Sequence, residues 1–177
     1  MRISMCTAGL AGMSLLGACD NAQIRVATPD ATRVVAATDI EAGRYLVQIT
    51  GCNDCHTPRG APGSPPVPEA DSLRGNGVGF YGPWGTTYAA NLRLTTANLT
   101  EDAWVDLLST RDARPIMPWA SVRAMDDADK RAIYRYIRSL PGEPGKPVPD
   151  GLPPGQVPTT PYEDLNVRMP AGAPPPR

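Results

Sequence analysis

The decapeptide GCNDCHTPRG, residues 51–60, contains two of the four cysteines of this 177-residue chain and its only histidine. Cys52 and Cys55 have the C-x-x-C spacing, and His56 follows them directly. On a helix, this spacing places the two thiols about one turn apart on the same face. The single histidine must therefore be explained together with the two thiols beside it.

The order C-x-x-C-H is the spacing of c-type haem attachment. Two thiols one helical turn apart match the span between the two vinyl groups of the porphyrin. The next residue is carried under the ring, where its imidazole can bind the iron. Covalent attachment also suits an exported protein, because a cofactor held only by packing could be lost outside the cell. We predict one haem c, attached to Cys52 and Cys55, with His56 as an iron ligand.

Three other interpretations of the motif stay open. A structural zinc site needs about four nitrogen or sulfur ligands, and beyond Cys52, Cys55 and His56 the mature sequence offers only Cys19. A thioredoxin-like dithiol expects a strand-helix-strand context, whereas here a helical pattern precedes the motif and Pro/Gly-rich chain follows it. A disulfide between the two cysteines is possible in a chain without cofactor. We favour haem over all three.

A second histidine ligand is excluded because the chain has no other histidine. The sixth iron position then falls to a methionine, falls to another weak ligand or stays open. We favour Met117, because Pro115 and Pro118 fix their φ angles and stiffen the loop that presents the thioether. Met125 and Met169 are the alternatives. A core gap-filling role for Met117 is the competing interpretation.

Composition narrows the function classes. The net charge of −1 gives no basic field for nucleic acid, so we predict no nucleic-acid partner. One Phe beside 21 Pro and 17 Gly leaves the core short of bulky side chains, which a large apolar cofactor would supply. The sequence contains no recognisable catalytic triad, phosphate loop or carboxylate pair. We therefore expect an electron-transfer protein that is not itself an enzyme.

The first residues resemble an export signal. Residues 1–19 contain one early cation, Arg2, then an apolar run that ends in Leu-Gly-Ala-Cys. This ending resembles a bacterial lipobox, in which Cys19 is acylated and becomes the mature N-terminus. The alternative is an ordinary secretory signal cleaved near Ala18. We predict a periplasmic lipoprotein anchored to the inner membrane through Cys19.

The rest of the chain divides into three parts: a tether over 20–37, a domain over 38–142 and a Pro-rich tail over 143–177. Helix signals begin at Thr38, where Glu41 completes a capping box, at Thr100, and at the acidic cluster that starts with Asp126. Residues 57–90 are too rich in Gly and Pro for a long helix or a central strand. We expect this loop to wrap a ligand. The tail is expected to be extended, disordered or draped on the domain.

Four blocks together resemble a known family: GCNDCHTP, GFYGPWGTTYAANL, RPIMPW and MDDADKRAIYRYIRSLP. They resemble bacterial class I cytochromes c related to the cytochrome subunits of membrane-bound alcohol and aldose dehydrogenases, in a single-haem version. The resemblance covers roughly residues 38–142. It implies an all-α fold, with about three main helices around the haem and the first and last helices crossing near Gly43 and Tyr136. It also implies Met117 as the axial ligand. After Asn91 the segment LRLTTANLT is shorter than in relatives.

The predicted function is that of a monohaem c-type cytochrome, which carries single electrons in a periplasmic respiratory or dehydrogenase-linked chain. Its partners would be a dehydrogenase, a quinol-oxidising complex or a terminal oxidase. Trp84 and Tyr88 are candidates for lining the haem, although simple core packing explains them equally well. Two alternatives remain: a haem-binding electron-entry subunit of a larger oxidoreductase, and a haem sensor or enzyme with an open sixth site.

Overall fold

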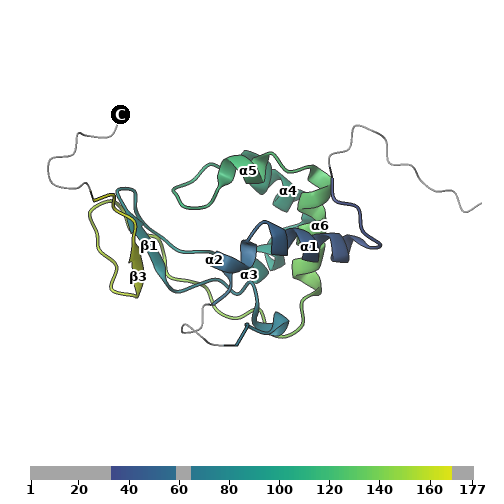
Figure 1. Cartoon of the computed structure of the whole chain (residues 1–177), viewed down its shortest axis with the longest axis horizontal. Helices are drawn as coiled ribbons and strands as arrows, with labels where there is room; N and C mark the ends of the chain where they lie inside the picture. The colour runs from purple at the N-terminus through teal and green to yellow at the C-terminus, as the bar shows by residue number, and fades with distance from the viewer. Residues whose placement is uncertain (1–32, 59–64, 169–177) are drawn as a thin grey trace, which may run out of the picture. The chain divides into compact units, whose positions relative to one another are not determined.

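A computed structural model describes residues 33–58 and 65–168. The signal segment, Cys19, most of the tether and Met169 lie outside the described residues. Figure 1 shows the order of the elements. The helices are α1 (Asp39–Ile49), α2 (Cys52–His56), α3 (Leu92–Ala97), α4 (Glu101–Thr110), α5 (Trp119–Arg123) and α6 (Asp127–Ser139), with a 3-10 turn η1 (Glu69–Asp71). The strands are β1 (Gly79–Gly82), β2 (Gly85–Thr87) and β3 (Tyr162–Asp164).

The three longest helices begin where their capping signals predict. Thr38 caps α1 and forms the predicted capping box with Glu41. Thr100 accepts a hydrogen bond from the third residue of α4, and Asp126 caps α6. The side chains thus satisfy backbone N–H groups that the first turn of a helix leaves free. These three predicted helix starts are confirmed.

Helices α1 and α6 cross at Gly43. A Cβ added to Gly43 would overlap the carbonyl oxygen of Ala132 and would lie 2.7 Å from Cβ of Tyr136. Only glycine lets the two backbones approach this closely. Gly43 and Tyr136 therefore meet at the crossing of the first and last long helices, as the resemblance implied.

The hydrophobic core lies between the three long helices. Its buried residues include Leu46 and Val47 of α1, Trp104, Val105 and Leu108 of α4, and Ala132, Ile133 and Ile137 of α6. The Nε1–H group of Trp104 donates to the Lys130 carbonyl at 2.9 Å. Ile49, the last residue of α1, is 56% exposed, whereas Val47 is buried.

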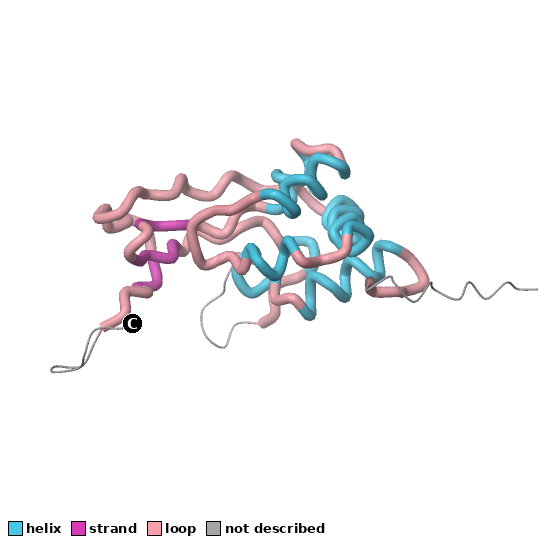
Figure 2. Tube along the Cα trace, turned by 90° about the horizontal axis from the view of Figure 1, so that it is seen from above, coloured by secondary structure: helices cyan, strands magenta, loops and turns pink. Residues whose placement is uncertain are grey.

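A three-stranded sheet corrects the all-α expectation. The strand order is β2-β1-β3, with β1 antiparallel to β2 and parallel to β3. Figure 2 shows these strands at the end of the chain trace away from the long helices. Strands of three or four residues are too short for an alternating pattern to predict them. The short helices α3 and α5 were also not predicted.

The described part of the tail, residues 143–168, follows an extended path on the domain and is called the C-terminal strap below. Asn91 Nδ2 donates to the carbonyls of Pro144 and Lys146, at 2.8 and 3.0 Å. Further along, the Tyr88 hydroxyl lies 2.7 Å from Thr160 Oγ1. The strap then adds β3 to the sheet beside β1. These contacts tie the strap to residues 79–91 along much of its length.

Candidate haem-attachment site

The C-x-x-C-H motif forms α2, a five-residue helix directly after α1. Gly51, with φ 69°, turns the chain between the two helices in a left-handed conformation that favours glycine. Cys52 and Cys55 are half-buried free thiols, and His56 is buried. The structure thus brings the three predicted attachment residues together on one helical turn, with both thiols available to react.

His56 is held in one tautomer. Its Nδ1 atom lies 2.8 Å from the Ala90 carbonyl oxygen, which can only accept, so Nδ1 carries the proton and Nε2 keeps its lone pair. Among the described residues, Nε2 has no hydrogen-bond partner. Burial lowers the pKa of His56, and the Ala90 hydrogen bond opposes this only in part. The result is a neutral, oriented imidazole, which is the form that binds a metal.

The loop after α2 is fastened to the end of this helix. The Thr57 hydroxyl donates to Asn53 Oδ1 at 2.8 Å and accepts from the Leu73 amide at 2.9 Å. The Gly75 amide donates to the His56 carbonyl at 2.7 Å. Residues 73–75 therefore fold back under α2 and fix the position of the histidine.

Buried Arg93 links residues 69–72 to Pro141, just after the end of α6. Its guanidinium donates to three backbone carbonyls, those of Ser72, Glu69 and Pro141, at 2.7 to 2.8 Å. Burial is the main influence on its pKa, which is lowered from the ordinary value. Sequence reasoning missed Arg93 and the Ala90 carbonyl. A backbone acceptor leaves no signal in a sequence, and a buried arginine looks like any other cation.

Several buried polar atoms of the described residues have no protein partner. They are Arg74 Nε, Asn76 Nδ2, Trp84 Nε1, Thr86 Oγ1 and Trp119 Nε1. Four of the five belong to residues 74–86, which follow the loop fastened to α2. A buried donor without an acceptor costs about 1–3 kcal/mol, so a water molecule or a bound group that supplies an acceptor would stabilise these atoms. The carboxylates of a haem are acceptors of this chemical kind.

Met117 is half-buried and packs against the hydrophobic core. Its carbonyl accepts from the Trp119 amide at 2.9 Å, where α5 begins. Met125 packs against the same core just before the cap of α6. Core packing thus applies to both methionines and does not distinguish them as ligands.

The segment over residues 84–90 contacts both the histidine and the Met117 loop. At one end, the Ala90 carbonyl accepts from His56. At the other, the Thr87 hydroxyl donates to the Pro115 carbonyl at 2.6 Å. Within this segment Tyr88, a predicted haem-lining residue, instead directs its hydroxyl to Thr160 of the strap, while Trp84 has an unpartnered indole N–H.

The structure also bears on the other interpretations of the motif. Among the described residues, no group of three or more His, Cys, Asp or Glu side chains is arranged to hold a metal ion, so the zinc hypothesis finds no ligand cluster there. Burial raises the pKa of the Cys52 thiol, whereas a redox dithiol acts as a thiolate with a lowered pKa. A helix and not a strand precedes the motif, and no disulfide joins its two cysteines.

An open cleft of about 580 Å³ lies beside the α1–α6 crossing and is lined in part by Asn53 and Asp54 of α2. Within it the Tyr136 hydroxyl donates to Glu69 Oε1 at 2.9 Å, and Arg44 Nη2 lies 3.2 Å from the same oxygen. Burial and the neighbouring carboxylate raise the pKa of Tyr136 to about 12. None of the four predicted haem-site residues lines this cleft.

Comparisons with known proteins give one distant similarity. No protein-family model matches the chain, and no solved structure matches it. The chain is 29% identical over 130 residues to the B subunit of a nicotinate dehydrogenase from Pseudomonas putida. The similarity covers 67% of this chain and 10% of that protein. The chain resembles a segment of a dehydrogenase subunit. In the described ranges, none of the helices has the length and apolar character needed to span a membrane.

Proposed function

We propose that this chain is a single-haem c-type cytochrome that transfers electrons one at a time between redox proteins. The observation that carries the proposal is the hydrogen bond from His56 Nδ1 to the Ala90 carbonyl, beside two free thiols on the same helical turn. This bond leaves Nε2 as the metal-binding nitrogen. Haem c, when bound, would supply a one-electron iron couple.

Each residue of the site has a separate task in this proposal. Cys52 and Cys55 would hold the cofactor covalently, and His56 would supply a nitrogen ligand to the iron. Met117 would supply a second ligand, as a soft and neutral thioether that favours reduced over oxidised iron. The unpartnered donors of residues 74–86 would be available to the haem carboxylates. A His/Met pair suits a carrier that delivers electrons towards an acceptor of high potential.

The partners proposed are a dehydrogenase, a quinol-oxidising complex or a terminal oxidase, met through small and transient interfaces. The similarity to a nicotinate dehydrogenase subunit of Pseudomonas putida favours a dehydrogenase-linked chain. It also supports a second candidate, an electron-entry subunit that stays bound to a larger oxidoreductase. Purification from detergent-solubilised membranes separates the two: a fixed subunit co-purifies with its complex, and a free carrier elutes alone.

The ligand assignment is tested by spectroscopy on protein matured in an export-competent host. With His/Met ligation, the oxidised wild type shows a weak sulfur-to-iron absorption band at the red end of the visible spectrum. Met117→Ala should abolish the band, lower the potential and allow carbon monoxide to bind the reduced iron. Met125→Ala, the matched control, should keep the band. The opposite pattern transfers the role to Met125, and a high-spin wild type favours a sensor or enzyme with an open sixth site.

Location is tested by fractionation. We propose a periplasmic protein held at the inner membrane by acylation of Cys19, and Cys19→Ser should release it into the soluble periplasmic fraction. Cys6→Ser removes the other cysteine of the first twenty residues and should leave the distribution unchanged. A wild-type protein that is already soluble in the periplasm contradicts the lipid anchor without affecting the haem proposal.

A further inference from the structure

The loop that presents Met117 makes polar contacts at Arg114 and Pro115, in addition to the packing of Met117 against the core. Residues 112–116 are all exposed, and they form no helix or strand. The base of the loop has its own support, because Arg123 Nη1 donates to the Arg111 carbonyl at 2.9 Å and the Arg111 guanidinium stacks over Trp119. These contacts lie at the base of the loop and do not involve Arg114 and Pro115, which form its tip.

Arg114 supplies the first of these contacts. Its Nη1 atom donates to the Leu152 carbonyl at 2.5 Å and to the Trp84 carbonyl at 3.2 Å. The neighbouring Pro115 carbonyl accepts from Thr87 at 2.6 Å. Three hydrogen bonds thus fall on the two residues that stand two and three positions before Met117. Bonds from a charged donor are stronger than those between neutral groups.

The acceptor of Arg114 belongs to the C-terminal strap, which is itself fixed at this point. Leu152 and Thr86 exchange two backbone hydrogen bonds, each 3.0 Å long. Next to it, a Cβ added to Gly151 would lie 2.8 Å from Arg114 Nη2 and 3.0 Å from the Thr86 carbonyl oxygen. The strap, β2 and the Met117 loop therefore meet closely at Gly151.

We infer that Arg114 and the Gly151–Leu152 segment of the strap are positioning elements for Met117, which limit the movement of the loop that carries its thioether. The inference rests on the proposed function. It assigns a role to the Pro-rich tail, because the strap supplies the Leu152 carbonyl to which Arg114 donates a hydrogen bond. Without this hydrogen bond, the exposed loop has fewer constraints, and an external ligand competes more easily for the sixth position on the iron.

The test compares Arg114→Ala and Gly151→Ala with two matched controls. Arg138→Ala removes an exposed arginine of α6, and Gly77→Ala adds a Cβ where no atom lies within 4 Å. In haem-loaded protein, both test variants should weaken the sulfur-to-iron band and bind imidazole roughly tenfold more tightly, as expected for the loss of one or two charged hydrogen bonds. Amide hydrogen exchange at residues 112–117 should accelerate. Arg114→Lys keeps a charged donor at this position and should therefore weaken the sulfur-to-iron band less than Arg114→Ala does.

The outcomes separate the two claims. The positioning role is overturned if the wild type shows the band and the test variants match their controls in imidazole affinity and in hydrogen exchange. That result leaves the proposed function intact. A wild type without covalent haem overturns both. Loss of the band together with loss of helical circular dichroism in both test variants assigns the contacts to general stability, and this also overturns the positioning role.

Discussion

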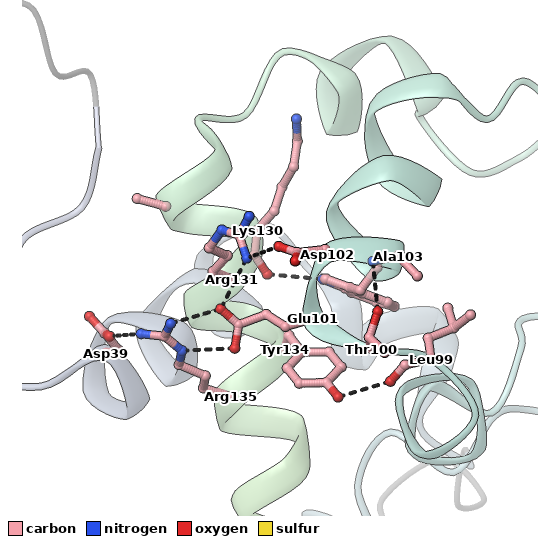
Figure 3. Close-up of polar contacts among 12 residues, drawn as sticks. Asp39, Leu99, Thr100, Glu101, Asp102, Ala103, Lys130, Arg131, Tyr134 and Arg135 are labelled. Atoms are coloured by element: carbon pink, nitrogen blue, oxygen red, sulfur yellow. Dashed lines mark hydrogen bonds and ion pairs between the residues drawn. The ribbon is translucent and has the colours of Figure 1, made fainter.

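Two regions of the molecule are built in different ways. In the helical region, formed by α1, α4 and α6, apolar side chains pack into one core, and charged side chains bridge the helices at the surface. Figure 3 shows this surface network, in which Glu101 of α4 pairs with Arg131 and Arg135 of α6, and Arg135 also pairs with Asp39 of α1.

In the loop region, formed by residues 65–93, the Met117 loop over residues 111–118 and the C-terminal strap, the contacts that join distant segments include many hydrogen bonds to backbone carbonyls. Arg93, Asn91 and Arg114 each donate to two or three of them. The comparison indicates that the helical region supplies stability and presents the attachment motif. The loop region supplies the groups that hydrogen-bond to His56 and to the loop before Met117.

The largest expected effect tests the close packing of the helical region. Gly43→Ala should destabilise the protein by about 3 kcal/mol, because the new methyl group meets the backbone of Ala132, which has little freedom to move. Chemical denaturation followed by circular dichroism measures the change. Gly77→Ala is the control, because its methyl group meets no atom within 4 Å. Equal stability of the two variants would contradict the described crossing.

The next effect tests the loop region. Arg93→Met should cost roughly 2 kcal/mol, because it leaves three backbone carbonyls, among them that of buried Ser72, without their donor while removing the cost of burying the charge. The same denaturation experiment measures it, with Arg138→Met on the surface of α6 as control. The variant should also bind imidazole at the iron more readily than the control does. A change in stability with unaltered ligand binding would separate Arg93 from the site.

The smallest effect concerns the surface network and is seen only in acid. Hydrogen bonds from Arg135 and Arg131 hold the pKa of Glu101 below its ordinary value of 4.5. The unfolded chain therefore binds the proton first, so this stabilisation is complete above about pH 4.5 and is lost as the pH falls through the folded-state pKa. Glu101→Gln should flatten that part of the stability profile. An unchanged acid slope would show that the network contributes nothing measurable.

The two regions also differ in how well the sequence predicts them. The caps at Thr38, Thr100 and Asp126 and the motif at Cys52–His56 depend on neighbours within four residues, so the sequence reveals them. The β1–β3 pairing joins residues about 80 positions apart, and the bond from His56 ends on the main chain of Ala90. Neither leaves a local signal. The sequence thus reveals the C-x-x-C-H motif itself, but not most of the groups that contact it in the structure.

The central claim is covalent haem on α2, and intact-mass measurement tests it most directly. Protein matured in an export-competent host should carry one haem per chain, and the mass should keep this addition after extraction with acidified acetone. Cys52→Ala combined with Cys55→Ala should remove the addition, while Cys19→Ser should retain it. A wild-type chain that loses all haem on extraction, or that carries the bare mass from the start, would contradict the claim.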